Sequence, residues 1–265
     1  MTHKKNRHLG FTADRYRHRA GFRPVTTLKL TRNTILFGCL ATSFFGQGPA
    51  KAPKVPIFIA PSMVDAVVLI AAPPALDSKK MSKDIAEIFA IHRSASPQEV
   101  ESANWDNKHE NIFAIAKVLG DKLTPEFLPA TAKLWAGMEN DQSIFVSAAK
   151  KFFQHPRPYD LDPNIKSICG SKPGGPKNSY PSGHGTVGYL SALVLTMMVP
   201  ERSEAIRTRA DEYAHNRVVC GDHYSADLPA SKEAAELIMG NMIGNPKFQQ
   251  EFAAAKAELR QALGL

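Results

Sequence analysis

Three short clusters in the second half of the chain combine positive charge with side chains that transfer protons. Their residues stand at fixed spacings: Lys150 and Arg157 in the first cluster, Pro181-Ser182-Gly183-His184 in the second, and Arg217, His223 and Asp227 in the third. Three cations can hold a phosphate dianion and the charge of its transition state. One histidine can attack phosphorus while the other protonates the leaving alkoxide. The clusters therefore predict phosphoryl transfer from a monoester, with no metal or other cofactor.

Spacing within the first and third clusters indicates how their side chains meet. Lys150 and Arg157 are seven residues apart, so they share a face if one helix carries both and ends at Pro156. His223 and Asp227 are four apart, so on a helix the carboxylate can bond one imidazole nitrogen. That bond fixes the tautomer and leaves the other nitrogen free to attack.

The second cluster has the composition of a helix start that binds an anion. Ser182 is a preferred N-cap residue, Gly183 lets the backbone approach a ligand, and His184 stands in the first turn. Unpaired N–H groups and the helix dipole favour an anion at such a start. We expect this segment to form one wall of a phosphate site.

Helices must position these clusters, because helix-start signals recur along the chain and no segment alternates like a strand. Ser96-Pro97-Gln98-Glu99 is a capping box, and Asp141 can cap the run to Phe153. The Pro- and Gly-rich stretch from Tyr159 to Tyr180 is a long connection of the kind that is often functional. We expect one all-α domain, a single helical bundle. Its helices are expected near 81–93, 97–119, 124–138, 141–155, 184–199, 202–219, 225–243 and 246–262.

The distribution of charge argues against nucleic acid as a partner. The chain has 265 residues and a formal net charge of +8. Nine Lys and Arg residues and one acid, Asp14, lie within residues 1–33, so this arm carries the whole excess. Acidic and basic residues balance in the rest of the chain. A basic surface for nucleic acid is therefore not expected on the folded part.

The basic arm leads into the pattern of a signal peptide. Residues 34–46 are uncharged, and Ala50-Lys51-Ala52 resembles a cleavage site. The uncharged run is too short for a membrane span, which takes about 20 residues. We predict a basic arm with a signal peptide at 1–52, an extended Pro-rich segment at 53–80 and a helical phosphatase domain at 81–265. The arm is unusually long, so a later start or an uncleaved arm stays open.

The mature protein is accordingly expected to be periplasmic or secreted, without stable membrane association, and homo-oligomerisation is left open. Cleavage after Ala52 removes Cys39 and leaves Cys169 and Cys220. In an exported protein these two cysteines allow a disulfide. Two buried thiols are the alternative, and the cysteine count does not decide between them.

The three clusters resemble the motif of the type 2 phosphatidic acid phosphatase superfamily, in which Lys-x6-Arg-Pro is followed by Pro-Ser-Gly-His and Ser-Arg-x5-His-x3-Asp. The chain has these elements at the same spacings, as Lys150-x6-Arg157-Pro158, Pro181-Ser182-Gly183-His184 and Arg217-x5-His223-x3-Asp227. It most resembles the bacterial class A non-specific acid phosphatases, which are exported, small and helical. The resemblance covers roughly residues 70–262.

The resemblance implies a fold of the acid phosphatase and vanadium haloperoxidase type, and a role for each matching residue. His223 is the implied nucleophile that forms a phosphohistidine, Asp227 orients it, and His184 is the general acid. The implied phosphate-binding residues are Lys150, Arg157, Ser182, Gly183 and Arg217. The implied substrates are small phosphate monoesters, with transfer of phosphate to alcohols as a further activity.

Two positions near the third cluster raise questions. Asn216 stands where the family pattern has Ser, which is expected to change a supporting hydrogen bond rather than the chemistry. Asp222 directly precedes His223, and a carboxylate facing the site would raise the pKa of His223 and repel substrate. The sequence does not tell which way Asp222 points.

Three other functions share part of the pattern. A vanadate-dependent haloperoxidase would use His223 as its vanadate ligand, but such enzymes are usually much longer. A lipid phosphate phosphatase is disfavoured because the lipid enzymes of the family have several membrane spans. A periplasmic phosphate-binding protein would have little use for the pair of His223 and Asp227.

Overall fold

The computed structural model describes residues 53–176 and 178–265. The predicted signal peptide and its cleavage site, within 1–52, lie outside the described residues. The described part is all-α, which confirms the predicted fold class. Its elements, with 3-10 helices written η, are η1 (Pro61–Leu69), α1 (Lys79–Ser94), α2 (Pro97–Lys108), α3 (Ile112–Ala116), η2 (Lys117–Leu119), α4 (Pro129–Phe153), α5 (Pro158–Leu161), α6 (Gly183–Met198), η3 (Pro200–Arg202), α7 (Ser203–Val219), α8 (Asp227–Met242) and α9 (Pro246–Ala262).

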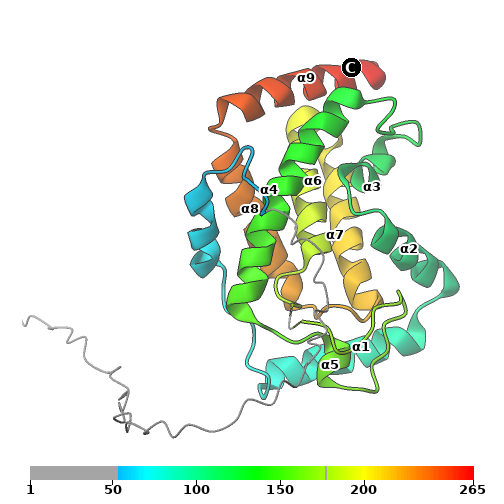
Figure 1. Ribbon diagram of the computed structural model, residues 1–265. Coiled ribbons are helices and arrows are strands. Elements are labelled where there is room, and N and C mark those ends of the chain that lie inside the picture. Colours follow the sequence, from blue (N-terminus) through cyan, green and yellow to red (C-terminus); the bar gives the residue numbers. More distant parts are fainter. Residues whose placement is uncertain (1–52, 177) are drawn as a thin grey trace, which may run out of the picture. The chain divides into compact units, whose positions relative to one another are not determined.

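The helix α6 forms the centre of the bundle. It packs against α7 and α8 and also contacts α4, while α9 crosses one end of these helices (Figure 1). Ten of its sixteen residues are buried, among them Leu190, Val194 and Leu195. A helix that is apolar nearly all round belongs inside a core. The first turn of α6 therefore starts from a fixed position.

A close approach between α6 and α7 is made at Gly188. A Cβ atom added there would lie 2.8 Å from Cδ1 of Tyr213 on α7, so only glycine fits without a shift. The buried hydroxyl of Tyr213 donates to the carbonyl oxygen of His109 at 3.1 Å, just beyond the end of α2. This contact ties the end of α2 to the two central helices.

The expected single helix at 97–119 is wrong. The helix α2 ends at Lys108, and a new helix, α3, starts at Ile112 after three intervening residues. The side chain of Asn111 accepts hydrogen bonds from the N–H groups of Phe113 and Ala114 at 2.9 and 3.3 Å. This N-cap overrides the apolar spacing, because the side chain satisfies two donors that open the new helix.

The expected division between helices at 124–138 and 141–155 is also wrong. The helix α4 runs unbroken from Pro129 to Phe153, and Thr124 lies in a turn before it. Asp141 is therefore inside a helix and caps nothing on α4.

The carboxylate of Asp141 instead binds the start of the described chain. It is fully buried and accepts hydrogen bonds from the backbone N–H groups of Ile57, Phe58 and Ile59 at 2.7, 2.6 and 2.9 Å. From the other end of the sequence, Nδ2 of Asn245 donates to the carbonyl oxygen of Phe58 at 2.8 Å. Polar groups of α4 and of the turn before α9 thus hold this segment against the bundle.

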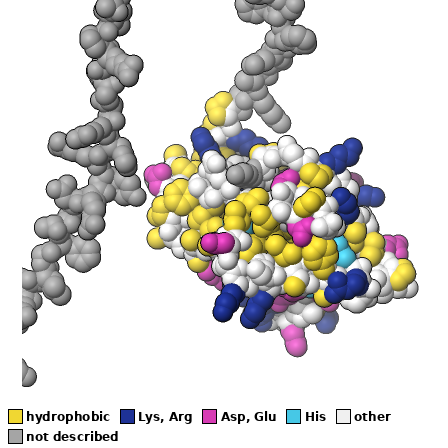
Figure 2. Space-filling view, turned by 90° about the horizontal axis from the view of Figure 1, so that it is seen from below, with side chains coloured by type: hydrophobic (Ala, Val, Ile, Leu, Met, Phe, Trp, Pro, Cys, Tyr) yellow, Lys and Arg dark blue, Asp and Glu magenta, His cyan; other side chains and the backbone are white. Residues whose placement is uncertain are grey.

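The surface of the described residues shows no concentration of basic side chains on the face at the α1 and α5 end. Figure 2 shows Lys and Arg spread around the edge of this face, with Asp and Glu between them. Within residues 53–176 and 178–265, none of the helices combines the length and the apolar character needed to cross a membrane.

Candidate active site

A cavity of about 370 Å³ opens where the ends of α2 and α4 meet the start of α6 and the loop after α7. Six of the eight catalytic and phosphate-binding residues expected from the sequence line it: Lys150, Arg157, Gly183, His184, Arg217 and His223. Asp227 and Ser182 are buried beside it without lining it. Three clusters that are far apart in the sequence therefore meet at one cavity.

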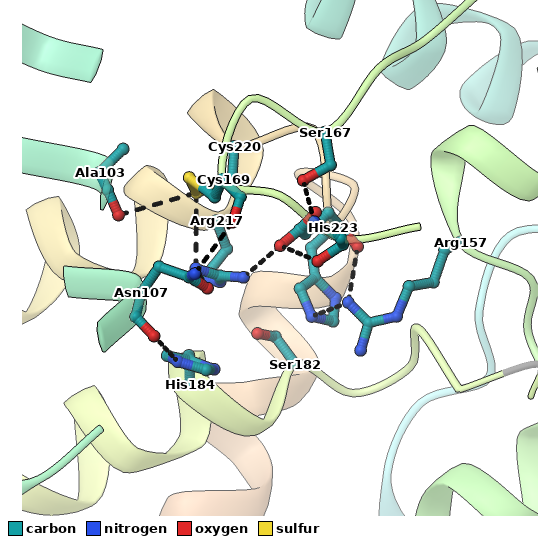
Figure 3. Close-up of polar contacts among 12 residues, drawn as sticks. Ala103, Asn107, Arg157, Ser167, Cys169, Ser182, His184, Arg217, Cys220 and His223 are labelled. Carbon is teal, nitrogen blue, oxygen red and sulfur yellow. Dashed lines mark hydrogen bonds and ion pairs between the residues drawn. A yellow bond between two sulfur atoms is a disulfide. The ribbon is translucent and has the colours of Figure 1, made fainter. Parts of the chain in front are cut away.

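Hydrogen bonds fix the tautomer of His223, and Figure 3 shows the one to Arg157. Nδ1 lies 2.9 Å from Oδ2 of Asp227, so this nitrogen carries a proton and donates it to the carboxylate. Nε2 lies 3.2 Å from Nη1 of Arg157, which can only donate, so Nε2 holds a lone pair. Burial, followed by the cations Arg157 and Lys150, holds the pKa of His223 well below its usual value. The ring is neutral and presents an unprotonated nitrogen.

Asp227 is fully buried at the first residue of α8. Besides His223, its Oδ2 accepts from Oγ of Ser179 at 2.5 Å and from the N–H of Tyr224 at 3.2 Å. Burial raises the pKa of Asp227 to about 7, while the bonds from Ser179 and Tyr224 lower it. His223 lies in the loop before α8, so the pair forms the expected bond without one helix carrying both residues.

The first cluster reaches the cavity by a different route from the expected one. The helix α4 ends before Pro156, because Gln154 adopts the left-handed conformation (φ 48°, ψ 42°). Lys150 and Arg157 therefore do not share a helix face. Arg157 is extended at the N-cap position of α5, where its Nε donates to Oδ1 of Asn178 at 2.8 Å. Both cations still line the cavity.

Lys150 projects from the last turn of α4 and is the one lysine among the described residues that line the cavity. Burial, and after it the positive charge of Arg157, lower the pKa of Lys150 to about 8. Desolvation favours the neutral amine, so a bound anion would raise this pKa again and keep the amine charged at higher pH.

Arg217 and Asp222 form a buried ion pair at the wall of the cavity. Nη2 of Arg217 donates to Oδ2 of Asp222 at 2.5 Å, and Oγ of Ser171 donates to the same oxygen at 3.0 Å. This contact shows which way Asp222 points: its carboxylate faces Arg217. The pKa of His223 is lowered and not raised, because burial and three cations outweigh this one carboxylate.

The start of α6 holds Ser182 and His184 in different ways. Oγ of Ser182 accepts from the N–H of Gly185 at 3.1 Å, so this hydroxyl caps the helix. The ring of His184 lines the cavity, with Nε2 3.3 Å from the carbonyl oxygen of Asn107 and Nδ1 3.4 Å from Oε1 of Glu110. Burial and the charge of Arg217 lower the pKa of His184 to about 3.

Cys169 and Cys220 form a disulfide with their Cα atoms 5.2 Å apart. This bond ties the long loop before α6 to the end of α7, three residues from His223. Next to it, Nδ2 of Asn107 donates to the carbonyl oxygen of Cys169 at 3.2 Å. The same Asn107 accepts from Nη1 of Arg217 at 2.9 Å through its Oδ1 (Figure 3).

Asn216 points away from the cavity, toward α2. Its Nδ2 donates to Oδ2 of Asp106 at 2.6 Å and to Oγ of Ser102 at 3.2 Å. Asp106 is also paired with Arg209. Asn216 therefore serves the packing of α7 on α2, beneath the site.

Sequence reasoning missed several residues that support or line the site: Asn107, Glu110, Ser171, Asn178 and Ser179. Two of them, Asn178 and Ser179, immediately precede the second cluster, and that proximity was an available signal. Asn107 and Glu110 lie at the end of α2 and just after it, far from every cluster in the sequence. Only the packing of α2 on α7 brings them to the cavity.

The lining suits a tetrahedral oxyanion. Lys150 and Arg157 supply cationic donors, the start of α6 opens toward the cavity at Gly183, and His223 offers a nucleophilic nitrogen. Within the described ranges, no group of three His, Cys, Asp or Glu side chains is arranged to hold a metal ion.

Comparison with known proteins agrees with this geometry. Residues 138–235 match the family model of the PAP2 superfamily. The chain is 28% identical to a non-specific acid phosphatase of Providencia stuartii over 202 residues, which cover 74% of this chain and 81% of the relative. It is 32% identical to a non-specific acid phosphatase of Salmonella typhimurium over 170 residues, which cover 62% and 67% of the two chains. An acid phosphatase of Zymomonas mobilis is 30% identical over 118 residues, 44% of this chain and 45% of the relative.

The match to the family model spans all three clusters, and the relatives extend the similarity over most of the chain. These matches confirm the family that the spacing of the clusters predicted. The chain belongs to the PAP2 superfamily and, within it, to the non-specific acid phosphatases.

Proposed function

We propose that this chain is an exported acid phosphatase that hydrolyses small phosphate monoesters through a phosphohistidine intermediate on His223. Its family makes it a phosphoric monoester hydrolase. The observation that carries the mechanism is the state of His223: Asp227 accepts the proton of Nδ1, and Nε2 holds a lone pair beside two cations. A periplasmic or secreted location is part of the proposal and rests on the signal-peptide pattern at 1–52.

In the first half of the reaction, Nε2 of His223 attacks phosphorus while the bond to the leaving oxygen breaks. Nη1 of Arg157 donates to this nitrogen at 3.2 Å. A bound phosphate oxygen is the stronger acceptor, so it draws the guanidinium away and exposes the lone pair. His184 passes a proton to the leaving alkoxide, and Lys150, Arg157 and the start of α6 stabilise the charge on phosphorus.

In the second half, water attacks the phosphohistidine and gives a proton to His184, and phosphate leaves His223. An alcohol that takes the place of this water would receive the phosphoryl group, which is the proposed phosphotransferase activity. Asp227 stabilises the positive charge that His223 carries while it is phosphorylated. Each step uses protein side chains alone, so we expect no requirement for a metal.

Replacement of His223 by alanine tests the proposal. Because it removes the nucleophile, His223→Ala is expected to abolish hydrolysis of p-nitrophenyl phosphate, a loss of about 10⁴-fold or more in kcat. Rapid acid-free quenching of the wild-type enzyme with radiolabelled substrate should trap an acid-labile, base-stable phosphoryl group on His223. A chelator should leave the wild-type rate unchanged.

A variant away from the cavity serves as the control. His92 bonds the carbonyl oxygen of Val219 at 3.1 Å and does not line the cavity, so His92→Ala should keep a trapped phosphoryl group. Undiminished turnover by His223→Ala would show that another group is the nucleophile.

A further inference from the structure

Glu110 stands beside the proposed proton donor at a position that no motif covers. It lies between α2 and α3 and lines the cavity, and its Oε1 is 3.4 Å from Nδ1 of His184. A Cβ atom built on Gly183 would lie 3.6 Å from the same oxygen and 3.9 Å from Nζ of Lys150. The carboxyl group of Glu110 is therefore close to the ring of His184, the start of α6 and the ammonium of Lys150.

Only one nitrogen of His184 is free to exchange a proton with a substrate. Nε2 bonds the carbonyl oxygen of Asn107 at 3.3 Å, and a carbonyl oxygen can only accept. Nε2 therefore keeps its proton whether the ring is neutral or charged. The acid–base nitrogen must be Nδ1, which is the nitrogen that faces Glu110.

The surroundings of His184 oppose a positive charge on its ring. Burial and the charges of Arg217, Lys150 and Arg157 lower the pKa of His184 to about 3. The Glu110 side chain keeps 44% of its surface exposed, and the partial desolvation of its carboxyl group raises its pKa. Both effects favour one proton held between the carboxyl group and Nδ1. The ionisable groups that face this pair come from three elements: Lys150 and the exposed Glu139 of α4, Arg157 at the start of α5, and Arg217 and Tyr213 of α7.

We propose that Glu110 is a positioning residue for the acid–base steps: its carboxyl group shares one proton with Nδ1 of His184 and keeps that nitrogen ready to protonate the leaving group. The inference rests on the proposed function and deepens it. As the P–O bond breaks and the bond from phosphorus to Nε2 of His223 forms, the shared proton passes from Nδ1 to the alkoxide oxygen. The Glu110 carboxylate is then left beside a neutral imidazole.

The second half of the reaction returns the proton. As water attacks phosphorus and the P–N bond to His223 breaks, one proton of the water moves to Nδ1 of His184. The carboxylate of Glu110 stabilises the imidazolium that results, at a contact of 3.4 Å. Protons and electron pairs therefore balance over the cycle, and the only reactants are the phosphate monoester and water.

The leaving group decides how much a substrate depends on this proton. Nitrophenolate leaves without protonation, whereas an alkoxide needs a proton as it departs. Glu110→Gln keeps the size of the side chain and removes its charge and its proton. Because general acid catalysis contributes about 10²–10⁴-fold, we expect kcat/KM for ethyl phosphate to fall at least about tenfold more than kcat/KM for p-nitrophenyl phosphate.

The pH profile gives a second readout. Removing a negative charge beside His184 lowers the pKa of its ring, so the protonated acid is lost at a lower pH. The alkaline limb of kcat/KM for ethyl phosphate should therefore move to lower pH in Glu110→Gln. If Glu110 had only a structural role, its substitution would lower kcat/KM for both substrates by the same factor and would leave the alkaline limb at the same pH.

Two matched variants complete the test. Glu110→Asp retains a carboxylate and should recover part of the difference between the two substrates. Glu139→Gln removes an exposed charge near Glu110 that does not contact His184, and it should affect both substrates equally. If Glu110→Gln does not fold, the alkaline limb of Glu110→Asp should still lie below that of the wild type, because its shorter side chain is farther from Nδ1.

The inference is overturned if Glu110→Gln changes kcat/KM for ethyl phosphate and for p-nitrophenyl phosphate by the same factor. If Glu110→Asp is the only variant that folds, the inference is overturned when its pH profile has the alkaline limb of the wild-type enzyme. Failure of the proposed function looks different, since the wild-type enzyme would then trap no phosphoryl group on His223, whatever the behaviour of the Glu110 variants.

Discussion

The three cations of the cavity differ in their acidic neighbours. Arg217 is paired with Asp222, and Glu110 lies near Lys150 in the same lining. Arg157 contacts only neutral acceptors, the side chain of Asn178 and the backbone and ring nearby. We therefore expect binding of a dianion to depend most on Lys150 and Arg157, the two cations for which the described residues show no direct carboxylate contact.

Phosphate affinity should report the ionisation of Lys150. Its pKa in the free protein is lowered to about 8, chiefly by burial. A bound dianion favours the charged ammonium, so affinity is full below this pKa and falls as pH rises through about 8. Competitive inhibition by inorganic phosphate, corrected for the ionisation of phosphate itself, measures this effect across the pH range.

Lys150→Arg provides the comparison for that measurement. A guanidinium stays charged throughout the range, so the decline in affinity near pH 8 should disappear even if binding is weaker at every pH. An unchanged decline in this variant would assign the titration to another group.

Single residues were predictable where a local spacing carries the chemistry. The sequence selected Lys150, Arg157, His184 and His223, and the structure brings all four to one cavity, although Lys150 and Arg157 do not share the expected helix face. The hydrogen-bond partner of His184 could not be predicted from the sequence, because Asn107 is 77 residues away and contacts His184 only in the folded chain. Ser179 was passed over because a serine next to a motif has many ordinary roles.

Among the elements, the loop before α6 and the end of α7 are joined most directly. The disulfide between Cys169 and Cys220 closes a segment with a sequence separation of 51. On one side of it Ser171 donates to Asp222, and on the other Asn107 holds both Cys169 and Arg217. The bond therefore supports the wall that contains the buried ion pair.

Removing this disulfide should reduce both stability and activity. For a closed loop of this length, the chain-entropy model gives about 4 kcal/mol in the free energy of unfolding. We expect Cys169→Ser/Cys220→Ser to unfold at a clearly lower temperature, with a lower kcat/KM because Asn107 and Ser171 lose their fixed loop. Thermal unfolding and steady-state kinetics measure the two effects.

Reduction of the wild-type protein is the matched control, since it breaks the same bond without substitution. Equal melting temperatures for oxidised, reduced and double-variant protein would show that the bond contributes nothing to the folded state.

Element boundaries were predictable where a strong cap or proline marks them, as at Pro97, Gly183 and Pro246. The predicted boundaries were wrong where a polar side chain could either cap a helix locally or bind a distant segment. Asn111 starts a helix that the apolar spacing ignored, and Asp141 resembles a cap while it binds a distant segment. A sequence pattern cannot choose between a local and a distant partner for such a side chain.

At the scale of the whole described chain, one buried carboxylate joins the first residues to the bundle. Asp141 accepts three consecutive backbone N–H groups, from Ile57 to Ile59. Replacing it by alanine leaves these donors without a partner, at a cost of about 1–3 kcal/mol for each group that stays buried. We expect Asp141→Ala to lose about 3 kcal/mol or more of unfolding free energy, measured by chemical denaturation.

Activity below the unfolding transition should be nearly unchanged in this variant, because neither Asp141 nor the segment it binds lines the cavity. Asp65→Ala, at an exposed carboxylate of η1 in the same region, is the control and should change stability by less than about 0.5 kcal/mol. A stability loss no larger than that of Asp65→Ala would contradict the assigned role of Asp141.

The three backbone N–H groups bound by Asp141 also affect the order in which segments of the chain can fold during synthesis. A ribosome releases residues 57–59 long before α4, and the same segment needs partners from near the far end as well: Asn241 accepts from the N–H of Ala60 at 2.8 Å, and Asn245 donates to Phe58. Buried backbone groups require partners, so the segment cannot settle until nearly the whole polypeptide has been released. The first described stretch to be synthesised is thus expected to be among the last to reach its native place, and an incomplete chain leaves that end accessible to proteases.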